Sequence, residues 1–217
     1  MTLHNPCNWR TIRLGVLALQ GDFHEHLQML RRLAAEMEGA LALELREVRL
    51  PQELTDLDGL IIPGGESTTF SKLAEGYGLI APLRNFAAAR PTWGTCAGMI
   101  FLAKELDNAA ALADEPQRVL GRMDLTVERN AFGRQVDSFV ADLPIVGLRG
   151  GPFHAIFIRA PIVSQAGAEV QVLARTADGR IVAARQGHLL ATSFHPELGE
   201  DLRLHRLFLN MVAESLA

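Results

Sequence analysis

The chain has 217 residues, a length that allows one large domain or two small ones. Its apolar fraction of 48% and its charged fraction of 21% are those of a globular protein and argue against a disordered chain. The 21 basic and 25 acidic residues give a formal net charge of −4, which disfavours binding to nucleic acid or to an anionic membrane surface.

The cysteines and the apolar runs indicate the compartment. Cys7 and Cys96 are too few for a disulfide framework and lack the spacing of a zinc site, so a reducing cytoplasm fits best. The apolar run at residues 14–19 is too short for a secretion signal, and no run approaches the roughly 18 residues that cross a bilayer. We therefore expect a cytoplasmic protein with no membrane contact, and we predict no metal and no cofactor.

In the first half of the chain, strand patterns alternate with helix patterns. Residues 1–11 are polar and irregular and are predicted to be a loose N-terminal extension. Apolar runs of strand length occur at residues 12–19, 41–48, 59–62 and 91–95, and helical spacing occurs at 24–37, 67–74, 79–89 and 97–106, with Gly39 as a C-cap of the first helix. This alternation predicts an α/β fold: an open, mostly parallel sheet between two layers of helices, with the active site at the carboxyl ends of the strands.

The second half is richer in strands. They are predicted at residues 125–128, 153–158, 170–175, 181–185 and 189–193, with Asp178 and Gly179 as a hairpin turn. Residues 202–216 form an amphipathic closing helix, with Leu204, Leu207, Phe208 and Met211 on one face. The pattern predicts an antiparallel flank to the sheet. Because no internal repeat or Pro-rich linker interrupts the chain, residues 12–217 are predicted to be one domain.

The segment Gly94-Thr95-Cys96-Ala97-Gly98 lies between a predicted strand and a predicted helix and has the form of a nucleophile elbow. Glycines flank the nucleophile in such a turn because a Cβ there would clash with neighbouring backbone. A cysteine at the start of a helix is also favoured as a thiolate by the helix dipole. A lone cysteine is more often a small buried apolar residue, but this turn favours a nucleophile.

A cysteine nucleophile needs a base, and the segment Ser193-Phe194-His195-Pro196-Glu197 follows a predicted strand. Because Pro196 favours an extended segment, His195 and Glu197 are expected to point the same way, so that the carboxylate orients the imidazole. A surface histidine beside a helix-capping glutamate is the alternative. The nucleophile turn and the histidine segment both follow predicted strands, and this shared position favours the triad Cys96, His195 and Glu197.

Acyl transfer also needs an oxyanion hole. The backbone N–H of Ala97 is one expected donor, and the loop Gly64-Gly65 after the strand at 59–62 is expected to supply the second. A loop without side chains can flip a peptide, so the hole can be formed on demand, although Pro-Gly-Gly alone is an ordinary turn.

Other polar groups have less specific patterns. His24 and His26, with Asp22 and Glu25, resemble a metal site, but residues two apart on a helix do not face one another, so a solvated helix start is favoured. Arg129 and Arg159 are either a clamp for a substrate carboxylate or surface cations. The other histidines show no partner pattern, and they are His4, His154, His188 and His205.

With these residues in place, the chain resembles the class I, triad-type glutamine amidotransferases, which have a flavodoxin-like fold. More narrowly, it is similar to the glutaminase subunits of pyridoxal 5′-phosphate synthase. The matching segments run in family order over nearly the whole chain: GVLALQGD (15–22) with Glu25 and His26, LIIPGGESTT (60–69), GTCAG (94–98), VERNAFGRQVDS (127–138), FIRAP (157–161) and SFHPEL (193–198).

The resemblance implies that Cys96 attacks the side-chain amide of L-glutamine, releasing ammonia and forming a thioester that water hydrolyses to glutamate. His195 would be base and then acid, and Glu197 would orient it. The resemblance assigns Gln20 to the neighbourhood of the partner interface and the oxyanion loop. It assigns glutamine binding to six positions, which are Gly65, Glu66, Ser67, Arg129, Ile158 and Arg159.

The resemblance also implies a partner, a (β/α)8 synthase subunit in dodecameric rings, which receives the ammonia and activates the glutaminase when the two dock. A glutaminase serving a different synthase is an alternative, against which the RNAFGRQ stretch argues. A non-catalytic, flavodoxin-like binding module is a second alternative. The presence of all three triad residues argues against it.

Overall fold

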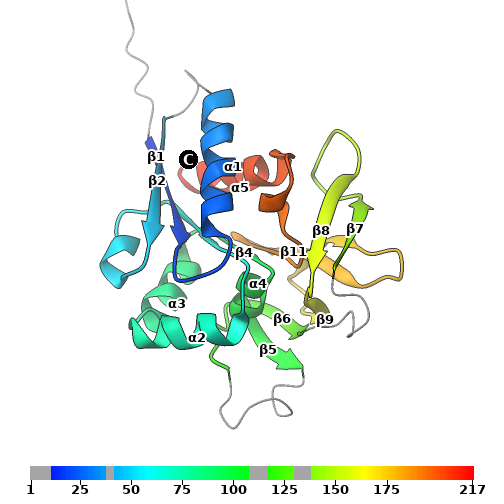
Figure 1. Cartoon of the computed structure of the whole chain (residues 1–217), viewed down its shortest axis with the longest axis horizontal. Helices are drawn as coiled ribbons and strands as arrows, with labels where there is room; N and C mark the ends of the chain where they lie inside the picture. Colours follow the sequence, from blue (N-terminus) through cyan, green and yellow to red (C-terminus); the bar gives the residue numbers. More distant parts are fainter. Residues whose placement is uncertain (1–10, 38–41, 108–116, 130–137) are drawn as a thin grey trace, which may run out of the picture.

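The computed structural model describes residues 11–37, 42–107, 117–129 and 138–217 (Figure 1). Its helices are α1 (Phe23–Glu36), α2 (Ser67–Gly76), α3 (Ile80–Ala89), α4 (Ala97–Leu102) and α5 (Arg203–Ser215), with short 3-10 turns η1 (Pro51–Leu54) and η3 (Pro196–Leu198). Its strands are β1 (Thr11–Leu17), β2 (Ala42–Val48), β3 (Gly59–Ile62), β4 (Thr92–Thr95), β5 (Ala103–Asp107), β6 (Met123–Glu128), β7 (Ser138–Leu143), β8 (Phe153–Ile158), β9 (Ile162–Ala166), β10 (Gln171–Arg175), β11 (Ile181–Gln186) and β12 (Leu189–Thr192).

Within these residues, ten strands form one sheet in the order β2-β1-β3-β4-β12-β11-β9-β6-β5, with β10 paired to β11. The first five strands in this order, β2, β1, β3, β4 and β12, are each parallel to their neighbours. From β12 through β11 and β9 to β6 the pairing is antiparallel, and β5 lies parallel to β6. A separate antiparallel pair joins β7 and β8. The predicted parallel sheet with an antiparallel flank is confirmed.

Helices cover both faces of the parallel half of the sheet (Figure 1). Every residue of β3 is buried, because alternate side chains enter two different cores. Ile61 packs in the core that α1 and α5 share, whereas Leu60 and Ile62 pack with α2, α3 and α4. The predicted three layers are therefore present.

The parallel strands place four polar or glycine-rich turns at one edge of the sheet. β1, β3, β4 and β12 are neighbours and run the same way, so their carboxyl ends lie together. Gln20 follows β1, Gly64 follows β3, Cys96 follows β4 and His195 follows β12. The fold thus creates a site at the edge where open α/β sheets bind ligands.

The chain departs from the predicted elements mainly around the antiparallel flank. The helix predicted at 97–106 ends at Leu102, and residues from Ala103 form β5 instead, because pairing with β6 overrides the local helical pattern. β7 and β9 were not predicted. The predicted turn at Asp178 and Gly179 is confirmed, since it joins the antiparallel strands β10 and β11.

The ends of the predicted first strand shift. β1 begins at Thr11, which the sequence places in the extension, and it ends at Leu17 instead of residue 19. Cys7, His4 and the predicted C-cap Gly39 lie outside the described residues. In the described ranges, no helix has the length and apolar character needed to cross a membrane.

Candidate active site

Cys96 occupies a strained turn between β4 and α4. Its φ of 47° lies in the left-handed region that residues with a Cβ rarely adopt, and such strain is characteristic of functional sites. Its N–H donates to the carbonyl of Thr192 on β12 at 2.8 Å, which fixes the turn against the neighbouring strand. The residue is buried, with 7% of its surface exposed. The backbone therefore has the geometry of a nucleophile elbow.

The glycines on either side of Cys96 are required by packing. A Cβ on Gly98 would overlap the carbonyl oxygen of Ile62 in β3, and a Cβ on Gly94 would overlap the backbone of Gly98. Both obstacles are backbone atoms, which cannot rotate away. The predicted steric reason for the Gly-x-Cys-x-Gly pattern is thus met in the structure.

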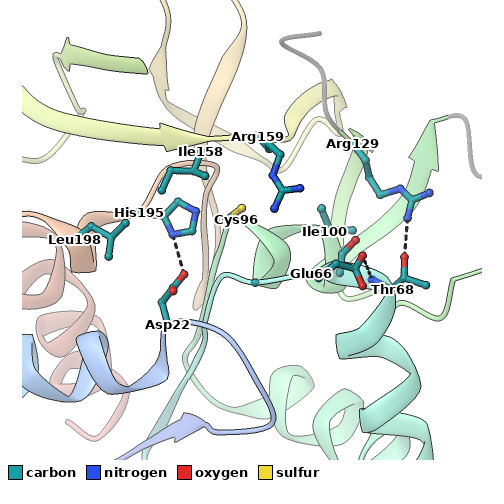
Figure 2. Close-up of a pocket in the computed structure, with 12 residues that line it drawn as sticks. Asp22, Glu66, Thr68, Cys96, Ile100, Arg129, Ile158, Arg159, His195 and Leu198 are labelled. Atoms are coloured by element: carbon teal, nitrogen blue, oxygen red, sulfur yellow. Dashed lines mark hydrogen bonds and ion pairs between the residues drawn. The ribbon is translucent and has the colours of Figure 1, made fainter. Parts of the chain in front are cut away.

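His195 lies against two carboxylates. Its Nδ1 is 2.7 Å from Oε1 of Glu197. The same nitrogen is 3.2 Å from Oδ2 of Asp22, the contact marked in Figure 2. The predicted pairing of His195 with Glu197 is present, but the predicted extended segment is not, because Pro196 begins the 3-10 turn η3. Pro is favoured at the first position of such a turn, and the turn brings the carboxylate back under the ring.

The surroundings of His195 favour its charged form. Burial lowers its pKa, but hydrogen bonds with Asp22, Cys96 and Glu197 outweigh burial, so the pKa lies well above its ordinary value. Burial raises the pKa of Glu197, which His195 opposes. With Nδ1 engaged by carboxylates, the other ring nitrogen remains for the Cys96 thiol. Cys96, His195 and Glu197 thus have the order of contacts of a catalytic triad.

The loop after β3 is tied to the loop after β1. Nε2 of Gln20 donates to the carbonyl of Glu66 at 3.1 Å, and the N–H of Glu66 donates to Oε1 of Gln20 at 3.3 Å. The N–H of Asp22 donates to the carbonyl of Gly64 at 3.4 Å. Gly65 has a φ of 145°, and a Cβ there would meet the amide of Gln20. These contacts place Gln20 directly on the predicted oxyanion loop.

One cavity of about 510 Å³ brings the predicted site residues together (Figure 2). Two of the triad residues, Cys96 and His195, line it, and Glu197 lies behind His195. All six positions predicted to bind glutamine also line it, and these are Gly65, Glu66, Ser67, Arg129, Ile158 and Arg159. Ala97, the other predicted oxyanion donor, begins α4, where an N–H has no acceptor within the helix.

The polar wall of the cavity is built around the start of α2. Glu66 caps this helix by accepting from the N–H groups of Thr68 at 3.0 Å and Thr69 at 2.6 Å. Partial burial opposes ionisation, but hydrogen bonds from Thr69 and Thr68 lower the pKa of Glu66 to about 2. Glu66 therefore presents a fixed negative charge at one end of the cavity.

Positive charge lies at the same end. Arg129 donates to Gln117 at 2.5 Å and to Thr68 at 3.4 Å, while its buried Nε has no hydrogen-bond partner among the described residues. The guanidinium of Arg159 points into the cavity, and Arg159 itself has a strained φ of 42° (Figure 2). Of the two interpretations of these arginines, their place on the cavity wall favours a clamp for an anionic group.

Three residues around the site were not predicted from the sequence. Asp22 contacts His195, and Gln117 bridges Ser67 and Arg129. His26 is fully buried and contacts His205, so a solvated helix start is wrong for His26, although His24 is exposed as expected. The helical phase of α1 carried the signal for His26, since Leu27, Leu30 and Leu33 mark the buried side. Gln117 had no local signal.

Comparisons with known proteins agree with this geometry. A model of the SNO glutamine amidotransferase family matches residues 16–214. The chain is 53% identical over 204 residues to pyridoxal 5′-phosphate synthase subunit PdxT of Dehalococcoides mccartyi, covering 94% of this chain and 98% of that protein. It is 53% identical over 206 residues to the protein of the same name from Acidothermus cellulolyticus, covering 93% of this chain and 94% of that one.

Solved structures also match this chain. A crystal structure described as a glutamine amidotransferase matches with a TM-score of 0.80 at 50% identity, covering 92% of this chain and 98% of that chain. A Thermoplasma acidophilum protein described as a GMP synthase subunit matches with a TM-score of 0.63 at 15% identity, covering 94% of this chain and 96% of that one, and it supports the fold alone. On the match over residues 16–214, the chain belongs to the SNO glutamine amidotransferase family.

Proposed function

We propose that this chain is the glutaminase subunit of a pyridoxal 5′-phosphate synthase, hydrolysing L-glutamine to L-glutamate and ammonia. The observation that carries the proposal is the single cavity that joins Cys96, His195 and the two arginines. The reactive groups and the charged groups that recognise an amino acid thus meet in one space. The names of the relatives, which are subunits of pyridoxal 5′-phosphate synthase, give the pathway.

The first half of the reaction forms a thioester. His195 takes the proton of the Cys96 thiol, and the thiolate sulfur attacks the side-chain amide carbon of glutamine. Glu197 stabilises the imidazolium through its contact of 2.7 Å with Nδ1. The developing oxyanion accepts hydrogen bonds from the N–H groups of Ala97 and Gly65. Collapse of the intermediate breaks the C–N bond, and His195 returns the proton to the leaving ammonia.

The second half releases glutamate. Water loses a proton to His195 and attacks the thioester carbon, and the tetrahedral intermediate uses the same oxyanion donors. When the C–S bond breaks, glutamate leaves and Cys96 recovers its proton through His195. No atom is lost from the protein, so the triad is ready for another glutamine.

The amino acid end of glutamine meets the charged wall of the cavity. Arg159 and Arg129 pair with the α-carboxylate, and the fixed anion of Glu66 faces the α-ammonium. Ile158 and the backbone of Gly65 and Ser67 complete the contact. A substrate lacking either α-group leaves one of these charges unpaired, so glutamine is favoured over a simple amide.

We also propose the finer features of the assembly. The ammonia is delivered to a (β/α)8 synthase subunit in a dodecameric core, in the cytoplasm, and residues 12–217 form the single domain that carries the activity. Gln20 is the residue through which docking acts, because it holds Glu66 at the oxyanion loop from the neighbouring β1 loop. A partner that moves the β1 loop therefore also moves the oxyanion loop.

The test is glutamate release by the purified chain, measured with and without the synthase subunit. The proposal predicts low activity alone and at least about tenfold stimulation on docking, equivalent to about 1.4 kcal/mol of transition-state stabilisation. Gln20→Ala is expected to reduce the stimulated rate, with Gln28→Ala, an exposed residue of α1, as the control. Equal rates with and without the synthase subunit would assign the chain to another partner.

A further inference from the structure

Two buried histidines lie behind the catalytic carboxylate. His26 on α1 and His205 on α5 are both 0% exposed, in the core between these helices and the sheet. Oε1 of Glu197 contacts His195, whereas its buried Oε2 has no hydrogen-bond partner among the described residues. The Nε2 of His26 lies 3.3 Å from this oxygen. The second oxygen of the triad carboxylate therefore faces an imidazole.

The polar contacts continue from His26 into the core. Nε2 of His26 also lies 3.1 Å from the hydroxyl of Thr95, the residue before the nucleophile. Nδ1 of His26 is 3.0 Å from Nε2 of His205. Nδ1 of His205 is buried without a hydrogen-bond partner in the part of the chain that the structure describes. A line of contacts thus runs from Glu197 through His26 to His205.

These contacts select one arrangement of protons. If His205 carries its proton on Nε2, it donates to Nδ1 of His26, and the proton of His26 lies on Nε2, facing Glu197 and Thr95. The unpaired Nδ1 of His205 is then a bare acceptor. The reverse arrangement buries an unpaired N–H on His205 and turns the lone pair of His26 toward a carboxylate. Because an orphaned buried donor costs more than an orphaned acceptor, the first arrangement is favoured.

We propose that His26 is a positioning residue that donates its Nε2–H to Glu197, with His205 fixing the tautomer, so that the triad extends into the core as Cys96, His195, Glu197, His26 and His205. This inference rests on the proposed function of the triad. Neither added histidine touches substrate. They act by holding the carboxylate that holds His195.

The electrostatics agree with a neutral donor. Burial, followed by the nearby His205 and His195, holds the pKa of His26 well below its ordinary value, and burial lowers the pKa of His205 to about 3. The titratable groups that face Glu197 are His195, Asp22 and His26, and Cys96 acts through His195. A neutral N–H favours the ionised carboxylate without burying a second cation. Trp93 packs edge-on against both imidazoles and limits their rotation.

Two substitutions of His26 separate the donor from the packing. The amide of glutamine reaches the place of the imidazole Nε2, whereas the shorter asparagine reaches only the place of Nδ1. His26→Gln therefore keeps a donor to Glu197, and His26→Asn removes it. Both are prepared in a Cys7→Ser chain, so that Cys96 is the remaining thiol. Melting temperatures of both variants show whether each is folded.

The readouts are the pH dependence of Cys96 alkylation by iodoacetamide and glutamine hydrolysis with the synthase subunit. His26→Asn is expected to lower kcat at least about tenfold with KM within about twofold, because a hydrogen bond to a charged group is lost. Without its donor, Glu197 is protonated at higher pH and no longer stabilises the imidazolium that accompanies the Cys96 thiolate. The acid limb of the alkylation profile, where the rate rises with pH, therefore moves up by about half a pH unit. His26→Gln is expected to retain most of the rate of glutamine hydrolysis and to leave the acid limb of alkylation at its original pH.

Equal losses in the Gln and Asn variants, or an unshifted acid limb in His26→Asn, would overturn the inference. Alkylation needs no turnover, so a chain that shows the predicted limbs but hydrolyses no glutamine defeats the proposed function and not the role of His26. If His26→Asn does not fold, the tautomers of the parent chain decide: ¹⁵N NMR must show both His26 and His205 protonated on Nε2. A proton on Nδ1 of His26 overturns the inference.

Discussion

At the scale of single residues, two carboxylates compete for one imidazole nitrogen. Glu197 is nearer to His195 than Asp22 is, and it is buried, whereas the side chain of Asp22 is 33% exposed. Glu197 is therefore the better-fixed acceptor and the better orienter of the ring, since solvent weakens an exposed charge. Asp22 adds to the local negative charge and ties the oxyanion loop through its backbone.

Substitution of Arg159 tests whether the charged end of the cavity binds the α-carboxylate of glutamine. Arg159→Ala is expected to raise KM for glutamine about tenfold with kcat within about threefold, because uniform binding of the α-carboxylate is lost while the reacting atoms are unchanged. Steady-state kinetics with the synthase subunit measure this. Arg90→Ala is the matched control, because Arg90 is exposed and does not line the cavity. A lower kcat with an unchanged KM would place Arg159 in the chemistry instead of in binding.

The buried histidines predict how stability depends on pH. An unfolded histidine gains a proton as pH falls through about 6.5, but folded His205 stays neutral down to a pKa of about 3. The unfolded state then binds more protons, so stability falls as pH falls. His205→Gln keeps a donor and cannot titrate. Its free energy of unfolding is expected to lose about 1.4 kcal/mol less per pH unit than that of the parent chain between about pH 6 and 4.

Urea unfolding of the two chains at several pH values in this range gives that difference. Contributions from Glu197 and His195 are common to both chains and cancel. Parallel pH profiles would show that His205 is protonated in the folded protein.

At the scale of elements, the elbow between β4 and α4 depends on close approach to β3. Gly98→Ala is expected to destabilise the protein by at least about 2 kcal/mol, because its Cβ meets the Ile62 carbonyl and α4 must move off the sheet. Gly76→Ala is the control: Gly76 ends α2, and nothing lies within 4 Å of an added Cβ. Urea unfolding should show the control unchanged or slightly stabilised. Equal free energies of unfolding for Gly98→Ala and Gly76→Ala would refute the packing argument.

The elements also show where sequence patterns suffice. The strands of the parallel half were predictable because burial on both faces gives continuous apolar runs, as in β3. β7 and β9 were not, since β7 is mostly exposed or partly buried, β9 has a single buried residue, and both depend on pairing with other strands. The same non-local pairing converts residues 103–107 from a predicted helix into β5.

In the candidate site, too, residues with a local sequence pattern were predictable and residues that depend on distant contacts were not. Cys96, His195 and the loop at Gly64 were predictable because each lies within three residues of the end of a strand, and the topology brings those strand ends together. Glu197 was predicted with the correct contact for the wrong backbone reason. The helical phase of α1 marked the burial of His26 but not its partner, and His205 and Gln117 were missed because their partners lie far along the chain. A pattern read along the sequence does not show such pairs.

At the scale of the whole molecule, the proposed domain of residues 12–217 has a simple test. Removal of residues 2–10 is expected to leave the melting temperature within about 2 °C and glutamine hydrolysis within about twofold, because β1 begins at Thr11 and the cores of both faces lie beyond it. Thermal unfolding and the coupled assay measure the two quantities. A large loss of stability would make the extension part of the fold.

The central claim, that Cys96 carries a γ-glutamyl thioester, is tested most directly by mass spectrometry of the chain quenched in acid during turnover with glutamine and the synthase subunit. The account predicts one γ-glutamyl group on the peptide that contains Cys96, present in Cys7→Ser and absent, together with turnover, in Cys96→Ser. Glutamate release that continues in Cys96→Ser, or an adduct on any other residue, would contradict it.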